Sequence, residues 1–157
     1  MKKGFTMIEL IFVIVILGVL ASVAIPRLAA TRDDAEVAKA ATNLATAVSD
    51  ITAYYTAKGT VTGMSQKFNE ITNALTKTGE LQMKGATCAT IALPVTTNTV
   101  KASDKVEITI KFTGSDQACK TLQTLSSVKQ MCGKAATETI DATGCKIQIG
   151  GSGGIKW

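Results

Sequence analysis

The sequence predicts an α+β fold, in which one long N-terminal helix of about residues 6–58 packs on a small antiparallel sheet with short helices. Three observations indicate this fold. An uncharged apolar run covers residues 10–25, and an amphipathic helical stripe follows from residue 33 onward. The second half of the chain alternates apolar and polar residues, the pattern of strands with one buried face. The 157 residues suffice for one domain with a modest core.

The apolar run LIFVIVILGVLASVAI covers Leu10–Ile25 and is the only stretch of membrane length in the chain. Met7 and Ile8 extend it on the other side of Glu9. A charged side chain at membrane depth costs about 2.5–3.5 kcal/mol on insertion scales, so Glu9 is expected to have a partner and a purpose.

Composition leaves three readings of this segment open. Lys2 and Lys3 followed by an apolar stretch outline a secretory signal peptide, with a small-residue cleavage site at 22–24. The helical pattern continues past that site, however, and Glu9 would lie inside the apolar region. A plain membrane anchor explains the length but not the carboxylate. The third reading is an assembly helix.

The order of residues favours the third reading. The stretch Gly4-Phe5-Thr6-Met7-Ile8-Glu9, between two lysines and the apolar run, closely resembles the prepilin signature of the type IV pilin and type II secretion pseudopilin superfamily. Pro26 stands where this family usually has a proline. The close resemblance covers about the first thirty residues, and the rest of the chain is pilin-like in layout only.

This resemblance implies that a prepilin peptidase cuts between Gly4 and Phe5 and methylates the new amine of Phe5. Residues 1–4 would be a cytoplasmic leader, 5–32 the transmembrane and filament-core half of the helix, and 33–157 a periplasmic or extracellular head. Glu9 would form the assembly salt bridge with the terminal amine of a neighbouring subunit.

The resemblance also implies partners and a location. The partners are further pilin subunits, the prepilin peptidase, an inner-membrane platform protein, a cytoplasmic assembly ATPase and, before assembly, membrane lipid. The expected location is the bacterial inner membrane, crossed once with the head in the periplasm, and then an extracellular pilus or a periplasmic pseudopilus.

Two residues are expected to kink or locally unwind the first helix. Pro26 lacks a backbone donor and clashes with the preceding turn, and Gly18 is a second weak point. Pilin relatives are thought to lose helicity between such residues. Pro26 could equally mark the simple end of the membrane span, with Arg27 and Arg32 at the exit.

The second half of the helix has one apolar stripe and a cap at Gly59. The stripe consists of Val37, Ala41, Leu44, Val48, Ile51 and Tyr55.

The head is expected to contain two helices and three strands. Apolar spacing predicts a helix over residues 64–75 and another over 116–131. Strands are predicted at 91–95, at an edge because of Pro94, at 106–112 and at 145–149. The first two strands would form an antiparallel hairpin through a turn at 97–104.

Four cysteines behind an apolar N-terminal segment favour two disulfides, although free buried thiols remain the alternative. A single helix over 116–131 would separate Cys119 from Cys132 by about 20 Å, too far for a bridge. The remaining pairings are Cys88–Cys119 with Cys132–Cys145, which we favour, and Cys88–Cys132 with Cys119–Cys145. A Cys132–Cys145 bridge would resemble the C-terminal disulfide loop of many pilins.

No catalytic, metal or cofactor motif is present. The chain has no histidine, and its net charge of +5 is diffuse, so nucleic acid is not expected as a partner outside a DNA-uptake pilus. The acidic residues Asp33, Asp34 and Glu36 suit the first turn of a restarting helix better than a cation site. Calcium is not expected either, because the late loops offer only Glu138 and Asp141.

The expected function is therefore structural and not enzymatic: a pilin-like subunit, processed and polymerised into a type IV pilus. A pseudopilin of a type II secretion or DNA-uptake system is the alternative within the class. A monomeric membrane-anchored periplasmic binding domain is the alternative outside it.

Overall fold

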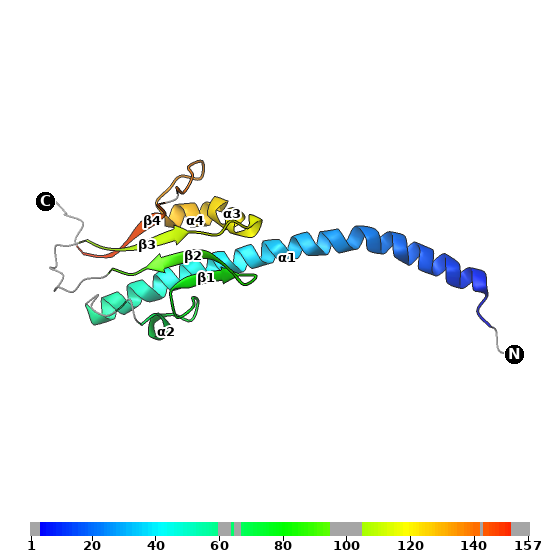
Figure 1. Cartoon of the computed structure of the whole chain (residues 1–157), viewed down its shortest axis with the longest axis horizontal. Helices are drawn as coiled ribbons and strands as arrows, with labels where there is room; N and C mark the ends of the chain where they lie inside the picture. Colours follow the sequence, from blue (N-terminus) through cyan, green and yellow to red (C-terminus); the bar gives the residue numbers. More distant parts are fainter. Residues whose placement is uncertain (1–3, 60–63, 65–66, 95–104, 142, 152–157) are drawn as a thin grey trace. The chain divides into compact units, whose positions relative to one another are not determined.

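The computed structural model (Figure 1) describes residues 4–59, 64, 67–94, 105–141 and 143–151, without the side chains of residues 29 and 30. The chain divides into two compact units, Met1–Ala35 and Glu36–Trp157. Lys2, Lys3, Val95 and the turn predicted at 97–104 lie outside the described residues.

The long helix α1, Met7–Lys58, begins in the first unit and continues into the second. In the described residues after it, a four-stranded antiparallel sheet and three short helices follow (Figure 1). This arrangement confirms the α+β, pilin-like fold class predicted from the sequence.

In the second unit α1 buries a narrow stripe, and this stripe differs from the predicted one. Leu44 and Ile51 have no exposed surface, but Ala40 and Ala47 are buried where Ala41 and Val48 were expected. The last two lie half-buried at the edge of the stripe.

The sheet has the strand order β1-β2-β3-β4, with every neighbouring pair antiparallel. Its strands are β1, Glu80–Met83, β2, Ala86–Ala92, β3, Val106–Phe112, and β4, Cys145–Gly150. Ile91, Ile110 and Cys145 are cross-strand neighbours in consecutive strands, so they share one face of the sheet. That face and the α1 stripe form one core, and Gly150 of β4 lies so close to the Tyr55 ring of α1 that a Cβ there would clash.

The edge assignment of the Pro94 strand is wrong. β2 pairs with β1 on one side and β3 on the other, and Pro94 lies two residues beyond its end. β1 was not predicted. It joins β2 through the two-residue turn Lys84-Gly85, in which both residues have positive φ (50° and 80°), the backbone that type I′ hairpin turns require.

A β-bulge in β2 turns two consecutive residues into the core. Ala89 pairs with Leu81 and Thr87 with Gln82, so Cys88 is the extra residue in the register. Cys88 and Ala89 consequently both lie at 0% exposure, which strict alternation would forbid.

The short helices are smaller than predicted. Residues 65 and 66 of the helix expected at 64–75 lie outside the described residues. The described part contains α2, Phe68–Ile71, which ends there because Thr72 is extended and its hydroxyl accepts a hydrogen bond from the N–H of Ala74. The helix expected at 116–131 is two helices, α3, Gln117–Thr124, and α4, Ser126–Met131. Leu125 between them has extended backbone (φ −60°, ψ 131°) and ends one helix while starting the next.

Candidate functional site

The candidate site is the N-terminal end of α1, where the helix starts at Met7. Gly4, Phe5 and Thr6 are not helical, so the Gly4–Phe5 peptide bond lies outside the helix. The first intrahelical hydrogen bond runs from the N–H of Leu10 to the carbonyl oxygen of Thr6 (3.3 Å), which makes Thr6 the N-cap residue.

Thr6 and Glu9 form a capping box. The backbone N–H of Glu9 donates to Oγ1 of Thr6 (3.4 Å), and the backbone N–H of Thr6 donates to Oε2 of Glu9 (2.9 Å). The Thr6 hydroxyl also donates to Oε2 of Glu9 (2.6 Å). Two backbone donors at the helix end are satisfied reciprocally in this way. The sequence reasoning missed Thr6, although the pattern Thr-x-x-Glu before an apolar run is the signature of this motif.

The capping box uses only one oxygen of the Glu9 carboxylate. Both hydrogen bonds from Thr6 end on Oε2, and within residues 4–59 no group donates to Oε1. Glu9 therefore has a local partner that holds its orientation, and a second oxygen on which a cation can bind.

The helix around Glu9 exposes a continuous apolar surface. All the exposed large apolar side chains of the described residues lie between Phe5 (84% exposed) and Leu28 (69%). An apolar surface of this extent is not stable in water and marks a membrane or protein interaction. α1 is long and apolar enough to cross a membrane, since Met7–Pro26 measures about 30 Å at the helical rise.

Gly18 and Pro26 both lie inside α1, which is helical on either side of them. A Cβ added at Gly18 would meet no atom within 4 Å. Pro26 has no N–H for the carbonyl oxygen of Ser22, one turn earlier. The kink at these residues stays a prediction.

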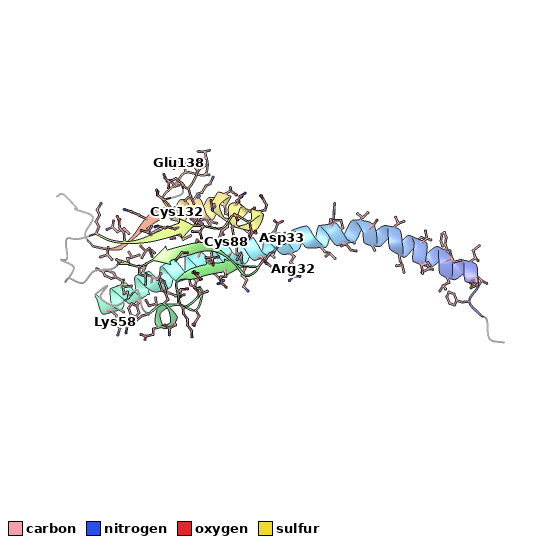
Figure 2. The ribbon with its side chains drawn as sticks, viewed as in Figure 1. Arg32, Asp33, Lys58, Cys88, Cys132 and Glu138 are labelled. Atoms are coloured by element: carbon pink, nitrogen blue, oxygen red, sulfur yellow. A yellow bond between two sulfur atoms is a disulfide. The ribbon has the colours of Figure 1, made fainter. Side chains whose placement is uncertain are left out.

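The four cysteines form two disulfides, Cys88–Cys119 and Cys132–Cys145, with Cα separations of 5.1 and 5.3 Å. The first joins the β2 bulge to α3, and the second joins the end of α4 to the start of β4. Figure 2 labels Cys88 of β2 and Cys132 at the end of α4. Gly114 packs so closely on the first bridge that a Cβ would clash with the Cys119 sulfur.

The second disulfide closes a loop, residues 133–144, that projects from the second unit with Glu138 at its outer end (Figure 2). The loop is held by local bonds. Lys129 is buried and its Nζ donates to the carbonyl oxygen of Ala136 (2.7 Å), and Glu138 Oε2 accepts from the N–H of Ala135 (2.9 Å). The Thr143 hydroxyl donates to Asp141 and holds the pKa of that carboxyl below its usual value.

A polar pocket of about 250 Å³ opens between α1 and the β1–β2 turn. Its lining includes Glu36, Lys39, Asn43, Gln82 and Lys84. Neither there nor elsewhere in the described part of the chain do three or more His, Cys, Asp or Glu side chains gather as metal ligands.

Comparison with known families identifies the start of the chain. Residues 1–25 match the prokaryotic N-terminal methylation motif, which is the type IV pilin and pseudopilin signature. No curated protein and no solved structure matches the chain. The motif supports a structural subunit of the pilin or pseudopilin type, and with the apolar start of α1 it fits anchoring in a membrane.

Proposed function

We propose that this chain is a prepilin that is cut between Gly4 and Phe5, methylated on Phe5, and polymerised into a type IV pilus. The methylation motif over residues 1–25 is the observation that carries the proposal. The non-helical Gly4–Phe5 bond beside a helix of membrane length supports it, because a peptidase needs an accessible scissile bond.

Assembly would be driven by two forces. The apolar side chains of residues 5–28 leave lipid to pack against the same surface of neighbouring subunits. The amine created at Phe5 binds Oε1 of Glu9 on the next subunit, because opposite charges at membrane depth are each costly alone. The charge pair would set the register between subunits, while apolar packing supplies most of the contact.

The subunit itself would catalyse nothing and would depend on other proteins. A prepilin peptidase would supply the cleavage and the methyl transfer, and a platform protein with a cytoplasmic ATPase would supply the work of assembly. The second unit, with both disulfides, would lie in the periplasm before assembly and outside the cell afterwards, because disulfides persist in oxidising compartments. A periplasmic pseudopilus would use the same parts.

Intact-mass analysis of the protein from its native host tests the proposal. We expect the mass of residues 5–157 plus one methyl group. A chain that keeps residues 1–4, as a membrane-anchored binding domain would, contradicts the proposal, and so does a chain that begins near Ile25 after ordinary export.

Substitution at Gly4 gives the matching genetic test. Gly4→Ala should leave the full-length chain in the membrane, because the residue before the cut is the one that the signature requires to be glycine. Gly18→Ala is the matched control, since a Cβ meets no atom within 4 Å at either glycine. The Gly18 variant should be processed normally, which would show that an added methyl group in the apolar segment is not itself the obstacle.

A further inference from the structure

The start of α1 raises a question that the processing signature does not answer, namely what keeps the bond to be cut out of the helix. In a bilayer, backbone groups without water must find internal partners, so a helix tends to extend to the end of its apolar segment. Here the helix begins only at Met7, and Gly4, Phe5 and Thr6 are not helical. The Gly4–Phe5 bond therefore lies just before the helix start.

The hydrogen bonds of Thr6 give the reason. If the helix continued backward, the N–H of Glu9 would donate to the carbonyl oxygen of Phe5. The Thr6 hydroxyl accepts that N–H instead (3.4 Å), and the Glu9 carboxylate takes the N–H of Thr6 (2.9 Å). The donor that would draw Phe5 into the helix is therefore already satisfied.

We propose that Thr6 is a positioning residue for processing, whose capping box with Glu9 fixes the helix start and keeps the Gly4–Phe5 bond in a non-helical, cleavable form. This inference rests on the proposed cleavage at that bond. Hydrolysis adds one water: the carbonyl carbon of Gly4 gains the hydroxyl oxygen and becomes a carboxylate, and the nitrogen of Phe5 takes a proton and leaves as the amine. A bond inside a helix presents neither atom to a peptidase.

The capping role makes a specific demand on the side chain at position 6. Valine has the shape of threonine but accepts no hydrogen bond, whereas serine and asparagine both cap helices despite their different shapes. Loss of a cap of typical strength, about 1 kcal/mol, corresponds to a factor of about five in the equilibrium between the non-helical and helical forms of this bond.

The experiment follows cleavage of the full-length chain in membranes that contain the prepilin peptidase, by intact mass over time. Thr6→Val should be cut about fivefold more slowly than the wild type, and Thr6→Ser and Thr6→Asn at close to the wild-type rate. Thr31→Val is the control, because Thr31 is an exposed helical threonine of the same unit whose hydroxyl donates to the Arg27 and Leu28 carbonyl oxygens and caps nothing.

Each other outcome overturns the inference. Normal cleavage of Thr6→Val shows that the cap is not needed, and equally slow cleavage of Thr6→Val and Thr6→Asn shows that the peptidase reads the shape of threonine. NMR of the uncut Thr6→Val chain in micelles shows whether residues 4–6 have become helical, which is the proposed cause of slow cleavage. Slow cleavage while residues 4–6 stay non-helical would also contradict the proposal. If the wild-type chain is never cut, the proposed function itself is wrong. The Thr6 variants alone cannot lead to that conclusion, so the two failures are distinguishable.

Discussion

At the scale of a single residue, Glu9 has one role that the structure shows, in the helix cap, and a second that we propose, in assembly. Its Oε2 atom belongs to the capping box with Thr6, and its Oε1 atom accepts nothing among residues 4–59. The first role needs only an acceptor, which a neutral amide also supplies. The second role, pairing with an amine, needs the negative charge.

Glu9→Gln should divide these roles. Glutamine keeps the capping box, so cleavage should continue at close to the wild-type rate. Assembly should fall more than tenfold, because an unpaired amine buried between apolar helices costs several kcal/mol. Immunoblotting for the processed chain measures the first, and the yield of sheared filaments measures the second. Filaments in normal yield from this variant would show that charge pairing does not drive assembly.

Asp141 offers a second prediction at this scale. The Thr143 hydroxyl, and then its backbone N–H, hold the pKa of Asp141 below the ordinary value. A group whose pKa is lower in the folded state stabilises that state above its unfolded pKa of about 3.9, and this contribution is lost as the pH falls through the folded pKa.

Thr143→Val should therefore raise the pKa of Asp141 toward its ordinary value. The stability of the folded disulfide loop should then fall less as the pH is lowered, because the folded and unfolded pKa values of Asp141 differ less. An NMR titration of the Asp141 carboxyl measures the shift. Thr137→Val, in the same exposed loop, should leave that titration unchanged; an equal shift in both variants would refute the assigned cause.

At the scale of elements, the parts that sequence predicts well are those with a long repeated pattern. Many periodic apolar positions predict α1 and β3, and β3 runs over Val106–Phe112 as expected. β1 has only four residues, Glu80–Met83, too few for alternation to stand out. The sequence could not place the core stripe of α1 on Ala40 and Ala47, because an alanine does not indicate whether its helix face is buried or exposed.

The breaks in the short helices and the bulge in β2 have local causes, which the apolar periodicity of the sequence does not reveal. A threonine hydroxyl ends α2 at Thr72, and one extended residue, Leu125, divides α3 from α4. The bulge at Cys88 depends on how β1 pairs with β2, which no single strand reveals. At the candidate site, Gly4, Phe5 and Glu9 were predicted from their order alone. Thr6 was missed because Glu9 was considered only as a charge.

The glycines beside the second disulfide allow an element-scale test. Gly133 and Gly144 flank the bridge and both have positive φ (67° and 81°). A Cβ at Gly133 would meet nothing within 4 Å, whereas one at Gly144 would clash with the carbonyl oxygen of Ile110 in β3.

Gly133→Ala should cost only the backbone strain, about 1–2 kcal/mol. Gly144→Ala should cost clearly more, because β4 must also move away from β3. Thermal or denaturant unfolding of the oxidised protein compares the two variants. Equal losses of stability would mean that the approach of Gly144 to the β3 backbone is not as close as the structure has it.

At the scale of the whole molecule, the two units bury their apolar residues in different ways. None of the residues described between 4 and 28 is buried, while the second unit has a core that includes the α1 stripe, the sheet and both disulfides. Among the side chains that the structure describes, the first buried one along the chain is Val37. The apolar part of the first unit therefore contributes nothing to that core and needs lipid or other subunits to cover it.

A chain of residues 29–157, which removes the apolar segment, should consequently fold as a soluble monomer with both disulfides formed. Sedimentation without detergent, cooperative thermal unfolding and the absence of alkylatable thiols before reduction would establish this. Leu44→Ala in this fragment should cost about 2–5 kcal/mol, because Leu44 is fully buried on the α1 stripe. Val48→Ala, at the half-buried edge of the same stripe, should cost less. If the fragment precipitated or needed detergent, the remainder of α1 would not be sufficiently covered by the sheet, and the separation of an anchoring segment from an independently stable second unit would be wrong.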